Sequence, residues 1–241
     1  MDAHGQRSAI VDLNKDPREV PNYGVTEAAR CLQLSRTTLR QWAAGRYDPH
    51  DPQRWMFEPL LRPASRTPLL LSFMNLVEAH VLSALRRKHQ IHLAKIRVAL
   101  AYLDQHLPSP HPLADQRFET DGLTIFIEQY GQLIDLGQVG QLAMRAVLET
   151  YLRRIERDAS GLAIRLYPFT SPNHTETSRS IVIDPTIAFG RPVLARRGIP
   201  TIVIAQRYKA GESMESLVED YGCEPLEIQE AIRCELHLEA A

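Results

Sequence analysis

The pattern that most limits the fold of this chain is a pair of short helices within residues 23–46, YGVTEAARCLQLSRTTLRQWAAGR. The Thr26 hydroxyl is expected to cap a first helix over residues 27–32, because it can accept a hydrogen bond from a free amide of the first turn. Ser35 is expected to cap a second helix over residues 36–44 in the same way. The short turn between the two helices predicts a helix-turn-helix.

The second helix has one apolar side and one polar side. Leu39, Trp42 and Ala43 follow helical spacing and are expected to face the core, and Gly45 is expected to end the helix. In DNA-binding proteins with this motif, the second helix lies in the major groove, where its side chains reach base edges. The side chains expected to point outward are Arg36, Thr37, Thr38, Arg40 and Gln41.

Each outward residue suits a particular contact with DNA. Arg36 and Arg40 lie one turn apart, and either could donate two hydrogen bonds to a guanine, while Gln41 could pair with an adenine. Thr37 and Thr38 are expected at phosphates, which position a protein without reading the sequence. The alternative is a helix-turn-helix that serves only in packing. Three further arginines are candidate contacts to the DNA backbone: Arg46, Arg54 and Arg62.

The rest of the front half predicts a mainly helical protein with small β hairpins. Two apolar runs, residues 55–61 and 69–73, are expected to pair as a wing beside the helix-turn-helix. Helices are expected over residues 72–88 and 92–106, where apolar side chains keep helical spacing. A loop is expected over residues 108–122, which are rich in proline.

The middle of the chain predicts mixed structure. Residues 123–128 and 132–136 flank Tyr130-Gly131 and are expected to form a hairpin around that turn. A long helix over residues 138–157 and a strand over residues 162–169 should follow.

A polar stretch rich in Ser and Thr, residues 171–179, is expected to link the front part to a second unit. That unit should begin with a strand over residues 181–183. It should continue as a three-helix, helix-turn-helix-like domain, in which Gly211 ends the first helix and Ser213 caps the second. The three helices are expected over residues 201–210, 213–221 and 225–236.

Charge is distributed unevenly along the chain, although the formal net charge is only −1. Residues 23–66 hold seven arginines against four acids, whereas residues 210–241 hold nine acids and one arginine. The basic part suits phosphate and the acidic part suits a basic protein surface, unless both are simply solvated faces. No apolar run reaches the roughly 20 residues of a membrane span, and the start lacks the pattern of a signal peptide, so a cytoplasmic protein is expected.

Three segments of the front half follow one another in a fixed order: Ser35-Arg36-Thr37-Thr38-Leu39-Arg40-Gln41-Trp42, then Leu85-Arg86-Arg87, then Lys95-Ile96-Arg97. In this order, residues 23–107 resemble the MerR-like winged helix-turn-helix family. The resemblance implies that the second helix reads DNA. The family's basic Gly-Tyr-Arg wing is absent here, and no cysteine-rich effector site follows, so metal sensing of the family's usual kind is not expected.

The last quarter of the chain has glycines, prolines and apolar residues in an unusual order: Asp184-Pro185, Gly190-Arg191-Pro192-Val193, Ile199-Pro200, Ala210-Gly211-Glu212-Ser213, Leu217, Tyr221, Ile228 and Ala231. In this order they resemble a small three-helix domain of bacterial antitoxins. Together with the front unit, they resemble a VapB-type antitoxin of a type II toxin–antitoxin system. The resemblance implies a PIN-domain ribonuclease toxin as partner. It also implies a repressor that acts on its own operon, as a homodimer on a palindromic operator.

Two ways of binding such a toxin are compatible with the sequence. Acidic side chains could cover the basic rim of its RNA site, and the candidates are Glu212, Glu215, Glu219, Glu227 and Glu230. Alternatively, an arginine could enter its acidic metal site, and the candidates are Arg191, Arg196 and Arg197. The sequence does not choose between these two interfaces.

The expected domains are an N-terminal arm, the winged helix-turn-helix unit, an unassigned segment that is a candidate for dimerisation, the linker and the antitoxin-type unit. Their residues are 1–22, 23–107, 108–170, 171–179 and 180–241.

Motifs of catalysis are missing, so no enzyme, cofactor or metal is expected. The sequence has no P-loop, no dinucleotide-binding glycines and no paired nucleophile and base. The histidines are expected to be solvated, because no Cys or carboxylate pair stands at metal-ligand spacing beside them: His80, His89, His92, His106 and His111. Two rivals to the antitoxin interpretation are a MerR-like regulator without a toxin and an enzyme whose site lies in residues 108–179.

Overall fold

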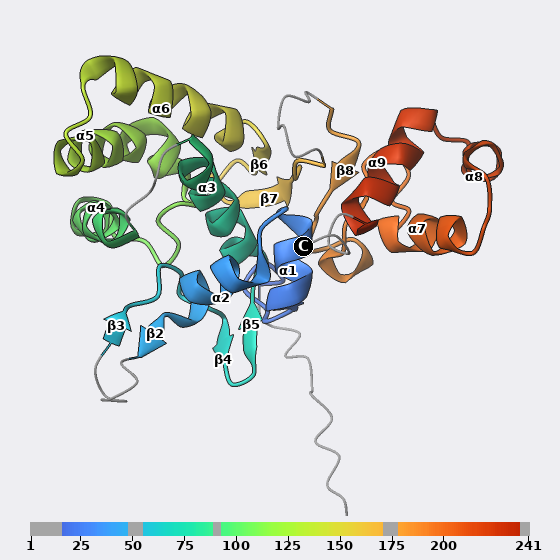
Figure 1. Ribbon diagram of the computed structural model, residues 1–241, viewed down its shortest axis with the longest axis horizontal. Helices are drawn as coiled ribbons and strands as arrows, with labels where there is room; N and C mark the ends of the chain where they lie inside the picture. Colours follow the sequence, from blue (N-terminus) through green and yellow to red (C-terminus); the bar gives the residue numbers. More distant parts are fainter. Residues whose placement is uncertain (1–15, 48–54, 89–92, 171–177, 237–241) are drawn as a thin grey trace, which may run out of the picture.

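The computed structural model describes residues 16–47, 55–88, 93–170 and 178–236. Within this part of the chain the protein is mainly helical, with four small antiparallel sheets (Figure 1). None of the described helices is both long and apolar enough to cross a membrane.

The two helices predicted for residues 23–46 are present. They are α1 (Val25–Cys31) and α2 (Arg36–Ala44). Ser35 caps α2 as predicted, because its hydroxyl accepts a hydrogen bond from the Thr38 amide at 3.2 Å. The prediction that Thr26 caps the first helix is wrong: Gly24 is the N-cap, without a side-chain hydrogen bond, and α1 starts earlier than expected.

The predicted pairing of residues 55–61 with 69–73 is wrong. β3 (Trp55–Phe57) pairs with β2 (Arg46–Tyr47), which directly follows α2. β5 (Leu69–Leu71) instead lies between β1 (Tyr23–Gly24) and β4 (Ser65–Arg66) in a three-stranded sheet. Only two residues separate β4 from β5, so their pairing costs little loop-closure entropy.

The middle of the chain is helical where a hairpin was expected. α3 (Phe73–Lys88) and α4 (Leu93–His106) agree with the predicted helices to within one residue. A π-helical turn, η1 (Phe118–Gly122), then leads into α5 (Leu123–Leu133), so the predicted loop is shorter and the predicted hairpin is wrong. The physical reason is an apolar stripe at helical spacing, which buries Leu123, Phe126, Ile127 and Tyr130 on one side of α5.

The long helix expected over residues 138–157 ends early. It is α6 (Gln138–Leu152), and β6 (Ile155–Arg157) follows it and pairs with β7 (Ala163–Leu166). The turn between these strands is closed by Asp158, whose carboxylate accepts hydrogen bonds from the Ser160 and Leu162 amides at 2.9 and 3.1 Å. β7 confirms the first half of the strand that was predicted over residues 162–169.

The C-terminal unit contains its three predicted helices. They follow a two-stranded sheet of β8 (Ile181–Val182) and β9 (Val193–Leu194), with a short 3₁₀ turn, η2 (Ala188–Gly190), between the strands. Ser213 caps the second helix as predicted, accepting from the Ser216 amide at 3.1 Å. Residues 171–177 of the predicted linker lie outside the described residues. The helices are α7 (Thr201–Lys209), α8 (Met214–Tyr221) and α9 (Pro225–Leu236).

Two hydrophobic cores hold the described residues together. The larger core takes buried side chains from Tyr23 to Phe169, together with Ile183, so the helix-turn-helix and the middle helices share it. The smaller core lies among β8, β9 and the three C-terminal helices. α9 lies against α1, which places the C-terminal unit beside the helix-turn-helix (Figure 1).

Candidate nucleic-acid interface

The outer side of α2 is the candidate surface for reading DNA. Leu39 and Trp42 anchor the inner side of the helix in the core, at 0% and 2% exposure. A helix that is fixed by its apolar side and offers polar side chains on the other has the form that enters a major groove. DNA contact by these side chains stays a prediction. The exposed ones along α2 are Arg36, Thr37, Arg40 and Gln41.

Thr38 does not belong to this exposed surface. It is only 8% exposed, and its hydroxyl oxygen lies 2.7 Å from that of Ser35. The cap of α2 therefore turns this side chain toward its own helix end. The predicted orientation of Thr38 toward DNA phosphate is wrong.

The β2–β3 hairpin extends the candidate surface beyond α2. Arg46 on β2 is exposed, directly after Gly45 ends the helix. The Leu60 and Leu61 amides donate to the Trp42 carbonyl at 2.8 and 3.0 Å, which ties the chain after β3 to the end of α2. These hydrogen bonds therefore fix the position of the hairpin relative to α2.

Two more arginines were predicted to contact the DNA backbone, Arg54 and Arg62. Arg54 lies outside the described residues. Arg62 donates a hydrogen bond to the Asp104 carboxylate on α4 at 2.9 Å. This is a surface pair, with the Arg62 side chain 65% exposed, and such pairs contribute only about 0–1 kcal/mol. Arg62 could therefore exchange Asp104 for a phosphate at small cost.

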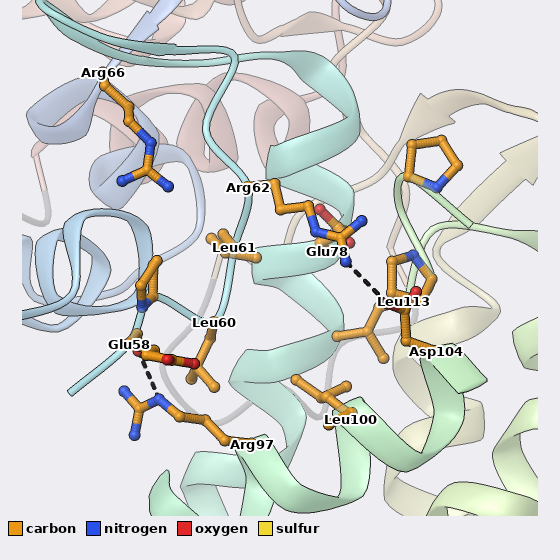
Figure 2. A pocket seen from close by; sticks show the side chains of 14 residues that line it. Glu58, Leu60, Leu61, Arg62, Arg66, Glu78, Arg97, Leu100, Asp104 and Leu113 are labelled. Carbon is orange, nitrogen blue, oxygen red and sulfur yellow. Dashed lines mark hydrogen bonds and ion pairs between the residues drawn. The ribbon is translucent and has the colours of Figure 1, made fainter. Parts of the chain in front are cut away.

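A cavity of about 390 Å³ lies between residues 58–62, which follow β3, and parts of α3, α4 and the 110–113 loop (Figure 2). Arg97 closes one end, where its Nε donates to the Glu58 carbonyl at 2.6 Å. The Arg62–Asp104 pair lies at the other end (Figure 2). Three arginines and three carboxylates line this cavity, so its charge favours no single class of ligand.

A buried network that the sequence did not predict meets this cavity at Glu78, one of the lining residues. Glu78 is 3% exposed, and its Oε2 lies 2.9 Å from His111 Nδ1 and 3.4 Å from the Asn75 side-chain nitrogen. Nε2 of His111 lies 3.0 Å from the Glu19 carboxylate. Burial alone lowers the pKa of His111, but the two carboxylates outweigh it and raise that pKa to about 9. Burial also raises the pKa of Glu78.

The prediction that the histidines are solvated is wrong for two of them. His111 is buried in the network above, and His80 is 2% exposed, with Nε2 3.1 Å from the Tyr151 carbonyl. His106 is exposed, as predicted, whereas His89 and His92 lie outside the described residues. No group of three or more His, Cys, Asp or Glu side chains within the described ranges could hold a metal ion.

The acidic residues predicted for a toxin surface divide into two groups. Glu215 and Glu219 are exposed on α8. Glu212 is half-buried and accepts a hydrogen bond from Arg207 at 2.8 Å. These three can meet a partner.

Two of the predicted acids are buried, so their assignment to an exposed acidic rim is wrong. Glu227 is 7% exposed, and its carboxylate accepts from the Glu224 amide at 2.9 Å, which caps α9. Glu230 is 1% exposed and accepts from the Ser178 hydroxyl at 3.1 Å. Both carboxylates serve the fold of the unit rather than its surface.

The three predicted arginines remain at the surface. Arg191 is exposed and lies 3.6 Å from the Glu27 carboxylate of α1. Arg196 is exposed in the turn after β9, and the exposed Arg197 donates to the Gly222 carbonyl at the end of α8.

The C-terminal unit is fixed to α1 by polar contacts that the sequence did not reveal. Arg30 of α1 pairs with Glu235 of α9, whose side chain is 2% exposed. Glu235 also accepts from the Thr201 hydroxyl at 2.6 Å. The signal in the sequence was slight: Glu235 stands in the apolar stripe of α9, four residues after Ala231.

Replacing Arg30 with alanine is expected to lower the free energy of unfolding by about 2 kcal/mol, because Glu235 would stay buried without its cation. Urea denaturation measures this change. Arg36→Ala is a matched control, since Arg36 is exposed on the neighbouring helix, and it should leave the midpoint unchanged. An equal midpoint for both variants would contradict a stabilising role of the Arg30–Glu235 pair.

Comparison with known proteins agrees with the helix-turn-helix. Residues 21–100 match a family described as "Putative DNA-binding HTH domain", and residues 181–233 match one described as "Protein of unknown function (DUF433)". The chain is also 29% identical over 233 residues to "Putative antitoxin VapB45" of Mycobacterium tuberculosis, covering 89% of this chain and 93% of that protein. It is similar to a named antitoxin over most of its length.

Two further comparisons find similarity to Mycobacterium tuberculosis proteins over a comparable span. "Uncharacterized protein Rv2308" is 24% identical, and the match covers 89% of each chain. The crystal structure of Rv2018 superposes with a TM-score of 0.63 at 26% identity, covering 88% of this chain and 98% of that one. The similarities therefore fit an antitoxin that carries a DNA-binding domain.

Proposed function

We propose that this protein is the antitoxin of a type II toxin–antitoxin pair, which neutralises a PIN-domain ribonuclease and represses its own operon. The observation that carries the proposal is similarity to a named antitoxin across 89% of the chain. The exposed polar side of α2 supports the DNA-binding half of the function. No catalytic role is part of this proposal, and the protein acts in the cytoplasm.

The DNA-binding half is proposed to work as a MerR-like homodimer on a palindromic operator. α6 supports self-association, because Val139 and Leu142 on this helix are 83% and 66% exposed. Apolar side chains one helical turn apart suit a second copy of the same helix. Light scattering on the DNA complex should count two chains per operator, and one chain per site would contradict the dimer.

Two surfaces of the C-terminal unit support the toxin-binding half. Glu215 and Glu219 are exposed together on α8 and suit a basic rim. Arg191 and Arg196 are exposed elsewhere on the unit and suit an acidic site. The MerR-like regulator without a toxin is the second candidate, since the match to a DNA-binding domain does not require a toxin.

Co-expression with the product of the neighbouring gene tests the antitoxin proposal. We expect the two proteins to co-purify and the antitoxin to rescue growth. The Arg36→Ala/Arg40→Ala variant should still rescue, because α2 serves DNA in this proposal. A neighbouring product that is neither toxic nor bound would favour the regulator without a toxin.

Point variants are better than truncation for finding the toxin surface, because removing residues 180–241 would also strip the pairing partner of Arg30. Reversing charge at Glu215 and Glu219 should abolish rescue if the acidic rim binds the toxin. Reversing charge at Arg191 should abolish it if an arginine enters the metal site. Rescue by both variants would place the toxin interface elsewhere.

A further inference from the structure

The side chain of Phe189, in η2 of the C-terminal unit, is exposed to solvent on a turn with an unfavourable backbone conformation. Its side chain is 87% exposed. Single exposed apolar residues are ordinary on protein surfaces, but this backbone is not. Ala188 has φ 48°, and Phe189 has φ 56° and ψ 35°, so two successive non-glycine residues occupy the left-handed region.

This conformation is disfavoured for a residue with a side chain, because its Cβ comes too close to the following carbonyl oxygen. It persists only where the surroundings impose it. Burial of the phenyl ring does not compensate the strain here, since the ring lies in solvent. Strained residues of this kind cluster at sites that engage ligands or partners.

Contacts from the front of the chain hold the strained turn in place. The Asn22 side chain donates to the Phe189 carbonyl at 2.5 Å, and the Tyr23 hydroxyl donates to the Gly190 carbonyl at 2.9 Å. Tyr23 is itself 1% exposed and belongs to β1, directly before α1. Asn22 and Tyr23 therefore hold the turn by its backbone carbonyls, next to α1 (Figure 1). The Phe189 ring is left exposed to solvent.

We infer that Phe189 is an anchor that inserts into an apolar pocket of the protein partner of this chain. The inference rests on the proposed function, because it takes that partner to be the toxin. Aromatic side chains are enriched at protein interfaces, where a few anchors in desolvated pockets carry most of the binding energy. Arg191, two residues further on, has a side chain 56% exposed and suits an acidic group at the rim of that pocket.

Two glycine variants distinguish the contribution of the Phe189 ring to binding from the contribution of the strained backbone. Phe189→Gly removes the ring and adopts the same φ freely, so the urea midpoint should stay level or rise while affinity for the neighbouring gene product falls about 30-fold or more. Ala188→Gly relieves the neighbouring strain but keeps the ring, so its affinity should stay within about threefold. Leu226→Ala, at a 52% exposed residue of α9, controls for loss of any surface apolar group.

The outcomes distinguish this inference from the proposed function. If the unmodified chain binds the partner and Phe189→Gly binds equally well, the anchor is overturned and the antitoxin proposal stands. If the unmodified chain forms no complex, the proposed function is overturned and the anchor with it. Phe189→Asn is a second variant, because asparagine also tolerates this backbone conformation. If both variants unfold, the Phe189 ring is needed for folding, and the inference is overturned. If the Phe189 variants change only the self-association of this chain, the ring contacts a second copy of the chain, and the inference is overturned.

Discussion

Replacing Arg36 and Arg40 together with alanine is expected to weaken binding to operator DNA about 100-fold or more. Each arginine that donates two hydrogen bonds to a guanine contributes about 1–3 kcal/mol of discrimination, and the two lie one turn apart on the exposed side of α2. Fluorescence anisotropy with a labelled fragment from upstream of the protein's own gene measures the change. Because both side chains are exposed, the urea midpoint should not move.

The controls distinguish sequence-specific contacts to bases from nonspecific electrostatic attraction to DNA. Arg153→Ala removes an arginine whose side chain is 74% exposed. Arg153 directly follows α6, a helix that lies away from α2 in Figure 1, so this variant should leave affinity unchanged. The α2 variants should lose preference for the operator over unrelated DNA, whereas loss of a phosphate contact would weaken both and flatten the salt dependence. Equal operator binding by the double variant and the unmodified chain would show that α2 does not read the DNA.

Raising the pH from 6.5 to 9 is expected to lower the stability of the folded chain through His111. Glu19 and Glu78 raise the pKa of His111 to about 9 in the folded state, against 6.5 for the ordinary side chain. Between these values the folded chain binds the proton that the unfolded chain releases, so the stabilisation is complete below pH 6.5 and is lost through pH 9. After a discount for partial solvent screening, the loss is about 2 kcal/mol.

Urea denaturation at a series of pH values measures this slope. His111→Gln should remove it and lower stability at pH 6, because Glu78 would stay buried without a cation. His106→Gln is the matched control, since His106 is exposed on α4, and it should keep the slope. A slope that survives His111→Gln would assign the titration to another group.

Several parts of the fold could be predicted because their signals are local. Ser35 and Ser213 cap helices through hydrogen bonds to amides three residues away, so their role depends on sequence spacing alone. Helical periodicity likewise located α3 and α4 to within one residue. The exposed side of α2 followed from its buried side, because Leu39 and Trp42 fix the direction of the helix.

Local signals misled where two structures fit the same residues. The Tyr130-Gly131 pair has turn chemistry, yet both residues lie inside α5 and are buried there. Apolar residues at positions 123, 126, 127 and 130 fit a helix that packs against α4, and that packing decided the outcome. Periodicity over so short a segment does not distinguish a helix from a hairpin.

The sequence by itself determined the helix-turn-helix, its exposed arginines and the three C-terminal helices, since caps and periodic stripes act within a few residues. Only the tertiary structure decided which charges are buried: Glu78 against His111, Glu235 against Arg30, and Glu230 away from the surface. It also decided that Phe189 stands in solvent on a strained turn. These features depend on residues more than 30 positions apart, and a charge is buried only where a distant chain segment supplies its partner.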